Sequence, residues 1–156
     1  MARLTAKAQQ ERQDIIDNAI MLHLLDGRWN ELTYKTLEQD TGIRTSTLQG
    51  YYRYSEDFPK AIQGKVFPWF LKHLDMTNVE SFTESWTESI QNQQFRNVLS
   101  MLLSSAMSKN PMASNGVMRL MDTITESFGK DGMEALKMLI GTTVFEIVIL
   151  DQKTTS

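Results

Sequence analysis

The sequence predicts an all-α protein, and three observations support this prediction. Apolar residues recur at helical spacing over long runs, beginning with Ile15, Ala19 and Leu22. Only 3 prolines and 8 glycines interrupt the 156 residues, which leaves long stretches free to be helical. The hydrophobic share of 41% is sufficient for a packed core. We therefore expect one helical domain, or a small helical head on a larger helical body.

Composition excludes several classes of protein. Because the chain has no cysteine, disulfides and thiolate metal sites are ruled out and a reducing cytoplasm is expected. The start, MARLTAKAQQERQD, has no apolar stretch of the kind found in secretory signals. The longest apolar run, at 144–150, is too short to span a bilayer. We expect a cytoplasmic protein with no membrane contact and no metal or other cofactor.

The charge is mildly acidic and unevenly distributed. The formal net charge is −3, which is not that of a strongly basic nucleic-acid binder. Residues 1–65 hold nine Lys/Arg and nine Asp/Glu, whereas residues 66–156 hold seven and ten. Any contact with DNA is therefore expected in the first part of the chain.

The first helix is predicted to run from about Thr5 to Asp26. Gly27 suits the left-handed residue that commonly follows a helix end. The apolar face of this helix consists of Ile15, Ala19 and Leu22 at helical spacing, with Ile16, Ile20 and His23 alongside.

A glycine turn separates the next two predicted helices, within the stretch DTGIRTSTLQGYYRY at 40–54. Thr33 can cap a second helix at 34–40, and Gly42 can supply the positive φ of a tight turn. A third helix is expected at about 45–52. Its inner face would consist of Leu48 and Tyr52.

A fourth helix is predicted to begin at Ser55, whose hydroxyl can cap it. Pro68 lies inside this run and predicts a kink or break near Phe67. The apolar stripe of the predicted helix is Phe58, Ile62, Val66 and Phe70.

The remainder of the chain predicts four more helices, at roughly 79–91, 94–109, 112–128 and 132–150. The joints are expected at Lys109-Asn-Pro111 and Gly129-Lys-Asp-Gly132. The tail at 151–156 is polar, and we expect it to fray.

The first part of the chain resembles the N-terminal domain of TetR-type (TetR/AcrR) transcriptional regulators. That family has a threonine-rich start to helix two, an Ala-Gly-Val turn, then Thr-Leu-Tyr-x-x-Phe and Ser-Lys-Glu-x-Leu. The matching run here is Leu32-Thr-Tyr…Leu37…Thr41-Gly-Ile43…Thr47-Leu48…Tyr51-Tyr52…Ser55-Glu-Asp-Phe58. The resemblance covers about residues 10–66.

The resemblance implies a three-helix helix-turn-helix head followed by a helical body, as in bacterial regulators. The DNA-binding domain would span 1–54, and a domain for dimerisation and effector binding would span 55–150. The implied function is that of a sequence-specific transcriptional regulator, a repressor, that binds a palindromic operator as a homodimer and is released by a small apolar ligand.

The residue types of the third helix suit the reading of DNA. The guanidinium of Arg44 can donate two hydrogen bonds to guanine, and the amide of Gln49 can form a pair of hydrogen bonds with adenine. Tyr51 and Arg53 would contact phosphates, which position the protein but do not specify sequence. The residues expected at DNA are Thr33, Arg44, Thr45, Ser46, Thr47, Gln49, Gly50, Tyr51 and Arg53.

Two other interpretations of this helix stay open. It can be an ordinary polar surface helix, or part of a helix-turn-helix protein that has lost operator binding and acts as a protein-interaction adaptor or antagonist. Arg44 replaces the usual serine cap, Gln49 a common tyrosine and Gly50 a larger side chain. Ser55 replaces or displaces a lysine that often touches phosphate. These departures leave the operator sequence unpredictable by analogy.

No constellation of residues predicts an enzyme. The motifs of zinc proteases, phosphate-binding loops and activated nucleophiles are absent from the sequence. His23 lies on the apolar side of the first helix and is expected to be a packed histidine. Glu84 and Glu88 can be read as an acid–base pair, but a solvated helix face is the simpler interpretation.

The ten methionines allow an adaptable apolar pocket in the body, because methionine fills irregular space. A methionine-rich core without a pocket is the alternative. The residues expected to line the pocket are Phe70, Trp86, Phe95, Met101, Met107 and Met121.

The last predicted helix has an apolar face that is wider than one small domain needs. Part of it is therefore expected to pack against a second copy of the chain in a two-fold homodimer. The residues assigned to that interface are Leu136, Ile140, Val144, Ile147 and Val148.

Overall fold

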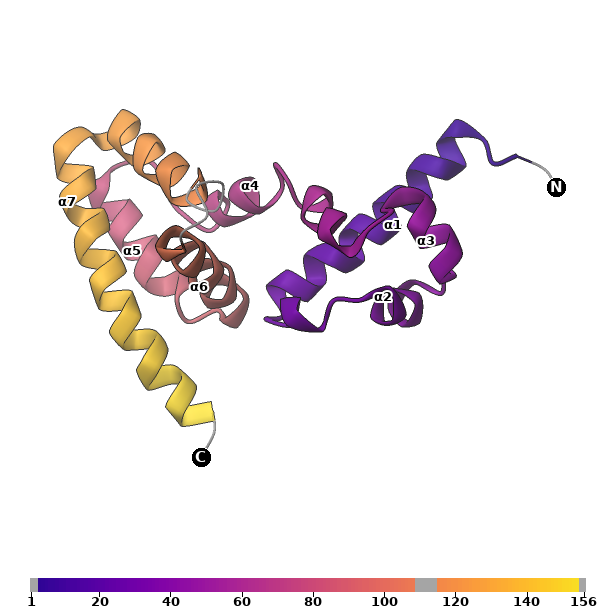
Figure 1. Ribbon diagram of the computed structural model, residues 1–156. Helices are drawn as coiled ribbons and strands as arrows, with labels where there is room; N and C mark the ends of the chain where they lie inside the picture. The colour runs from indigo at the N-terminus through magenta and orange to yellow at the C-terminus, as the bar shows by residue number, and fades with distance from the viewer. Residues whose placement is uncertain (1–2, 109–114, 155–156) are drawn as a thin grey trace. The chain divides into compact units, whose positions relative to one another are not determined.

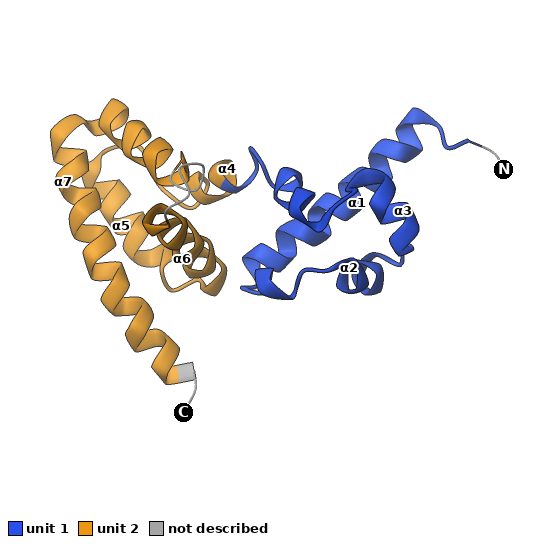
Figure 2. Cartoon of the chain, in the orientation of Figure 1, with its two compact units in different colours: residues 1–66 blue, residues 67–156 orange. Residues whose placement is uncertain are grey.

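A computed structural model of the chain describes residues 3–108 and 115–154. These residues form helices and connecting turns, with no β-strand among them, so the all-α prediction is confirmed. The chain divides into two compact units, at 1–66 and 67–156, which Figure 2 distinguishes by colour. The first unit extends past residue 54, because Phe58 and Ala61 belong to its core.

The first unit contains a long helix and four shorter helical segments (Figure 1). These are α1 (Ala6–Leu25), η1 (Trp29–Glu31), α2 (Tyr34–Thr41), α3 (Thr45–Tyr51) and η2 (Ser55–Ala61). The start of α1 is capped by Thr5 Oγ1, which accepts a hydrogen bond from the Ala8 N–H at 3.1 Å.

The turn between α2 and α3 has the conformation expected of a helix-turn-helix. Gly42 is left-handed at φ 72°, and its N–H donates to the Glu38 carbonyl, so a side chain at this position would be strained. Thr33 caps α2 as predicted, because its Oγ1 accepts from the Thr36 N–H at 3.1 Å. The prediction of a short third helix after a glycine turn is confirmed.

The core of the first unit lies between α1 and the segments that follow it. Its buried members are Ile16, Ile20, Leu37, Leu48, Tyr52, Phe58 and Ala61. The predicted apolar face of α1 was wrong in part. Ile15 and Leu22 are each 51% exposed, because α2, α3 and η2 pack against the row of α1 that carries Ile16 and Ile20.

The single fourth helix predicted from Ser55 is not present. Instead, η2 ends at Ala61, Gly64 follows with φ 78°, and α4 begins separately at Val66. Tyr54, rather than Ser55, occupies the N-cap position, and its N–H donates to Asp57 Oδ2 at 3.3 Å. The predicted apolar stripe is divided between the two units, because Phe58 is buried in the first and Phe70 in the second.

The break also lies earlier than predicted. It falls in the residues between η2 and α4, whereas Pro68 sits in the first turn of α4 (Val66–Leu71). A proline there removes no helical hydrogen bond, because the first N–H groups of a helix have no partner within it.

The second unit is built from α4, α5 (Val79–Ser89), α6 (Gln93–Met107) and α7 (Asn115–Thr154). Figure 1 shows α5 and α6 lying against α7. Asn78 and Asn92 cap α5 and α6 through side-chain oxygens that accept backbone N–H bonds. None of the described helices has both the length and the hydropathy needed to cross a bilayer.

Two features of α7 bear on the predicted joints. Gly129 has non-helical angles of φ 65° and ψ −146°, which confirms a joint between two helices at 129–132. The predicted joint at 109–111 lies outside the described residues. Helix α7 continues to Thr154 and so includes the first four residues of the tail that was predicted to fray.

Candidate nucleic-acid interface

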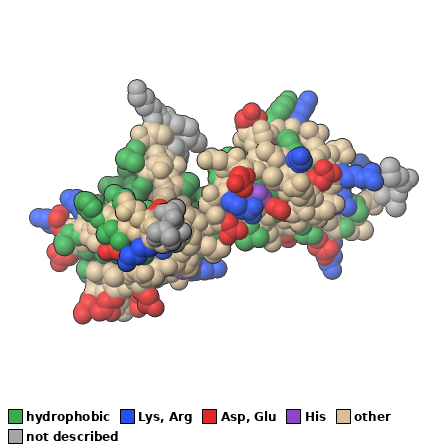
Figure 3. All heavy atoms as spheres, turned by 90° about the horizontal axis from the view of Figure 1, so that it is seen from below, with side chains coloured by type: hydrophobic (Ala, Val, Ile, Leu, Met, Phe, Trp, Pro, Cys, Tyr) green, Lys and Arg blue, Asp and Glu red, His purple; other side chains and the backbone are tan. Residues whose placement is uncertain are grey.

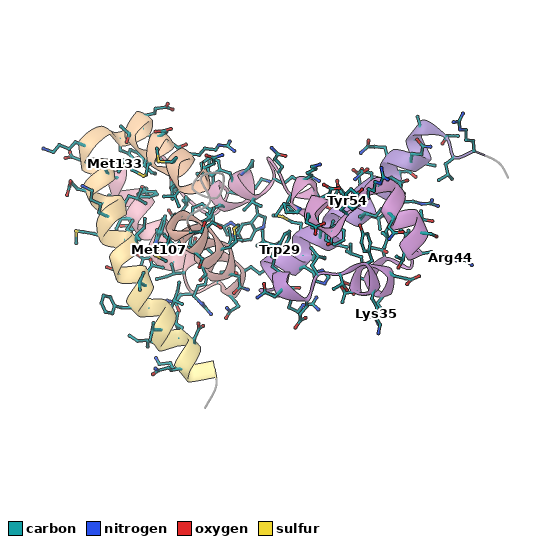
Figure 4. All side chains as sticks on the ribbon, in the orientation of Figure 1. Trp29, Lys35, Arg44, Tyr54, Met107 and Met133 are labelled. Carbon is teal, nitrogen blue, oxygen red and sulfur yellow. The ribbon has the colours of Figure 1, made fainter. Side chains whose placement is uncertain are left out.

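The outer face of α3 is polar. Arg44 is the N-cap residue, and its side chain makes no capping hydrogen bond. Arg44, Ser46 and Gln49 are all exposed, and Figure 4 shows Arg44 extending away from the ribbon. Because Ser46 and Gln49 are three residues apart, they lie on the same side of the helix. The start of α3 therefore presents a guanidinium, a hydroxyl and an amide to solvent.

The inner face of α3 is apolar and buried, as predicted. Leu48 is 1% exposed and Tyr52 is 7% exposed. Both pack in the same core as Ile16, Ile20 and Leu37. This packing determines which side of α3 faces outward.

The threonines of α3 are less accessible than Ser46. Thr45 and Thr47 are half-buried. Thr45 Oγ1 donates to Glu38 Oε2 at 3.3 Å, so this hydroxyl already connects α3 to α2. Gly50 is exposed, and a Cβ built there would meet no atom within 4 Å, which leaves the backbone open to close approach.

Tyr51 and Arg53 lie at the C-terminal end of α3. The Tyr51 hydroxyl donates to the Gln9 carbonyl at 3.5 Å, so half-buried Tyr51 contacts the N-terminal part of α1. Arg53 is exposed, and its guanidinium carbon lies 5.4 Å from the centre of the Tyr54 ring.

Thr33 is exposed at the start of α2, but its polar atoms are used within the helix. Its N–H donates to Thr36 Oγ1 at 2.9 Å, in addition to the capping bond from the Thr36 N–H. Lys35, two residues after this cap, is exposed, and its side chain also points outward in Figure 4.

A buried hydrogen-bond network holds the end of α3. The Tyr52 hydroxyl donates to Asp17 Oδ1 at 2.5 Å, and Gln13 Nε2 donates to the Tyr52 hydroxyl at 2.8 Å. The Tyr34 hydroxyl donates to the Tyr52 carbonyl at 2.7 Å. Burial raises the pKa of Tyr52 well above its ordinary value of 10, and the hydrogen bond to Asp17 and its charge raise it further.

Sequence reasoning missed the role of Asp17, which is 8% exposed. A signal was present, because Asp17 precedes Ile20 and Leu24 by three and seven residues and so shares their side of α1. An acidic residue on a core-facing row requires a polar partner. His23, by contrast, is the packed histidine expected, at 1% exposed with Nδ1 3.0 Å from the Ala19 carbonyl.

Several cations of the first unit are paired with acids. Lys60 Nζ lies 3.1 Å from Asp57 Oδ1, and Lys65 Nζ lies 3.5 Å from Asp17 Oδ2. Over most of the face seen in Figure 3, acidic and basic side chains are interspersed, although a group of acidic side chains gathers at the lower left of the view. Arg3 and Lys7, before and at the start of α1, are exposed and form no ion pair, and the same holds for three described cations in or next to α2 and α3 in sequence. These three are Lys35, Arg44 and Arg53.

The residues assigned to a ligand pocket are only partly brought together. Phe70, Trp86 and Phe95 are each 0% exposed. Phe70 stacks on Phe95 with ring centres 4.6 Å apart, and Trp86 meets both rings edge-on. These rings fill the core by direct contact with one another.

The methionines assigned to the pocket differ in position. Met101 and Met121 are half-buried. Met107 is 82% exposed at the end of α6, and Figure 4 labels it there. Met107 therefore does not share the environment of the buried aromatic residues.

The residues of α7 assigned to the dimer interface also differ in how far they are exposed. Leu136 is 2% exposed and belongs to the core of its own unit, whereas Val144 and Val148 are 47% and 53% exposed. Ile140 and Ile147 are half-buried. Sequence reasoning omitted two exposed apolar neighbours, Phe145 and Ile149, at 73% and 48%. Figure 3 shows hydrophobic side chains at the surface of this unit.

The described residues include no group of three or more side chains able to hold a metal ion. A family model described as the tetracycline repressor LuxT C-terminal domain matches residues 63–147. A helix-turn-helix unit followed by such a domain defines the class of TetR-type regulators. The match covers more than half of the chain, which therefore belongs to the tetracycline-repressor family. A comparison with curated protein sequences gave no match.

Proposed function

We propose that the protein is a sequence-specific DNA-binding regulator in which two copies present α3 to successive major grooves of a palindromic site. The observation that supports this most directly is the division of α3 into a polar outer side and a buried inner side. The N-terminal part of such a helix is the part that meets base edges. Membership of a repressor family supports the same function.

Each residue of the proposed interface has a role in this proposal. Arg44 would read guanine and Gln49 adenine, because their side chains match the donors and acceptors of those bases. Hydroxyls of Thr45, Ser46 and Thr47 would add contacts at the start of the helix. Gly50 would allow close approach of the backbone. Phosphate contacts would come from Thr33, Tyr51 and Arg53.

We propose a homodimer because two copies would double the small number of unpaired cations that one copy offers to DNA. One head offers Lys35, Arg44 and Arg53 near the proposed interface, and affinity for DNA depends on the number of phosphates neutralised. The exposed apolar residues at 144–149 of α7 are the proposed dimer surface, because apolar patches on monomers commonly mark interfaces.

Repression would follow from occupation of the operator. A small apolar ligand would have to part the packed rings of Phe70, Trp86 and Phe95 to bind among them with Met101 and Met121. Its binding would release the protein by changing the spacing of the two heads. In a thermal melt, such ligands should raise the melting temperature. If no small apolar compound does so, the effector part of the proposal fails and the DNA-binding part stands.

The function is tested by selecting bound duplexes from a random DNA pool at low salt. We expect a palindromic motif to be enriched by the wild-type chain. A double variant with Arg44→Ala and Gln49→Ala serves as the control, because both side chains are exposed and their loss leaves the core intact. The motif should be absent from the control selection.

The second candidate function is a protein-interaction adaptor without operator binding. The charge balance favours it, because residues 1–65 carry no net charge and two lysines of this unit are paired with acids. A folded dimer that enriches no duplex would contradict operator binding and favour this alternative.

A further inference from the structure

Asp17 places a carboxylate in the core of the first unit. Burial of a charge in a protein interior is costly unless hydrogen bonds and an opposite charge compensate it. The compensation here comes from three groups on different segments. Asp17 Oδ1 accepts from the Tyr52 hydroxyl at 2.5 Å and from Gln13 Nε2 at 2.9 Å, and Asp17 Oδ2 lies 3.5 Å from Lys65 Nζ.

The bond to Tyr52 controls the end of the recognition helix. Tyr52 is the C-cap residue of α3, and its N–H donates to the Leu48 carbonyl. Its hydroxyl is held by Asp17 and its carbonyl by the Tyr34 hydroxyl. Movement of Tyr52 would therefore move the C-terminal end of α3 relative to α1 and α2.

The only described cation within ion-pair distance of Asp17 is Lys65. Lys65 follows Gly64, which has φ 78°, and precedes α4. It lies at the end of the first unit, which runs to residue 66. The charge that compensates Asp17 thus comes from the connecting segment and not from the helix-turn-helix itself.

We propose that Asp17 and Lys65 are positioning residues for DNA reading, which hold α3 in its binding orientation through Tyr52 without either residue contacting DNA. This inference rests on the proposed function. Loss of the Lys65 charge leaves the Asp17 carboxylate with its hydrogen bonds to Tyr52 and Gln13 but without an opposite charge, and we expect the hydrogen bond to Tyr52 to adjust. The position of the connecting segment at residue 65 thereby influences the recognition helix.

Amide hydrogen exchange on the full-length chain tests the inference without DNA. We expect Lys65→Gln to increase exchange in residues 45–52 about fivefold, the effect of losing a partly exposed ion pair. Lys65→Arg should retain the wild-type rates, because the charge is kept. Lys60→Gln is the matched control, since Lys60 carries the same charge in the same region but pairs with Asp57.

A double variant decides whether Lys65 acts through Asp17. In an Asp17→Asn background the Lys65 charge has no carboxylate to compensate, so Lys65→Gln should cause no further increase in exchange. The inference is overturned if Lys65→Gln and Lys60→Gln give the same exchange in 45–52, or if the effect of Lys65→Gln persists in the Asp17→Asn background.

Salt dependence of operator binding separates positioning from direct phosphate contact. A positioning role for Lys65 predicts weaker binding by Lys65→Gln with an unchanged slope of log K against log salt. Loss of a phosphate contact would reduce that slope by about 0.9 for each copy, and this result would contradict the inference. If the wild-type chain binds no duplex at all, the proposed function fails, whereas the exchange measurements still decide whether the pair positions α3.

Discussion

The indole Nε1 of Trp86 donates a 2.8 Å hydrogen bond to Thr143 Oγ1, and both residues are buried. The Thr143 hydroxyl in turn donates to the Leu139 carbonyl at 2.5 Å. The bond connects α5 to α7 across the core of the second unit, and it satisfies a polar group that would otherwise lie unpaired among aromatic rings.

Replacement of Thr143 should therefore destabilise the protein. Thr143→Val keeps the shape of the side chain but leaves the buried indole N–H without an acceptor, which costs about 1–3 kcal/mol. Chemical denaturation followed by tryptophan fluorescence measures the loss. Thr142→Val is the control, because Thr142 is exposed on the same helix. Equal stability of the two variants would contradict a structural role for the hydrogen bond.

Two glycines of the first unit should respond to alanine in opposite directions. Gly42→Ala places a side chain at φ 72°, where the backbone strain costs about 1 kcal/mol. Gly50→Ala lies within α3 in open space and should stabilise the fold by up to about 1 kcal/mol, since alanine is the better helix former. Urea denaturation compares the two variants directly. A stabilising Gly42→Ala would be inconsistent with the left-handed turn.

The stability of the protein should fall above about pH 10 in a manner that depends on Tyr52. Its pKa is raised in the folded state by burial and by Asp17, so the unfolded chain releases this proton at a lower pH than the folded chain does. The free energy of unfolding therefore decreases as pH rises past the unfolded value near 10. Below that value the contribution is fully present.

Tyr52→Phe isolates this contribution, because it removes the hydroxyl and keeps the ring. Urea midpoints measured between about pH 9 and 11 should fall less steeply in Tyr52→Phe than in the wild type. Tyr54→Phe should follow the wild type, since Tyr54 is 56% exposed. The prediction is wrong if Tyr52→Phe and Tyr54→Phe show the same dependence on pH.

The proposed dimer surface predicts a change of oligomeric state. Val144→Glu introduces a charge among exposed apolar residues of α7, and the cost of burying that charge should prevent association. Sedimentation should then report a monomer for Val144→Glu and, on the proposed function, a dimer for the wild type. Thr125→Glu, at an exposed position of α7 outside the proposed surface, should remain dimeric. An unchanged dimer in Val144→Glu would require another interface.

Two arginines should affect DNA binding differently. Arg44→Ala should lose about 1–3 kcal/mol of affinity and relax the preference at one base position of each half-site. Arg53→Ala should weaken binding to all sequences alike and reduce the salt slope by about 0.9 for each copy. Binding of a small set of operator variants at several salt concentrations distinguishes the two effects. If Arg44→Ala lowered the affinity for every operator variant equally, Arg44 would have no role in reading a base.

Local signals in the chain predicted α1, α2 and α3 and their limits to within one residue. Thr33 and Gly42 each act through a hydrogen bond or a backbone angle within a few residues, so neighbouring sequence is enough to recognise them. The inner face of α3, with Leu48 and Tyr52, followed from helical spacing alone. The same reasoning recovered the joint at Gly129.

The errors arose where the outcome depended on distant segments. Ile15 and Ile16 are equally apolar, and only the positions of α2, α3 and η2 decide that Ile16 is buried and Ile15 is exposed. The break in the helix after Ala61 also depends on distant segments, because Phe58 is buried in the core of the first unit and Phe70 in the core of the second. Helical period describes a face but does not state which neighbours will cover it.

Composition, helical spacing and short capping motifs are properties of adjacent residues, and they predicted an all-α chain with a glycine turn between two short helices. The resemblance of residues 10–66 to TetR-type regulators identified that turn as part of a helix-turn-helix. Long-range packing decided the rest. The carboxylate of Asp17 forms a hydrogen bond with Tyr52, 35 residues later in the sequence, and an ion pair with Lys65, 48 residues later. Trp86 forms a hydrogen bond with Thr143, 57 residues later. Such contacts form because buried polar groups require partners wherever the chain can supply them, and no local pattern specifies where that will be.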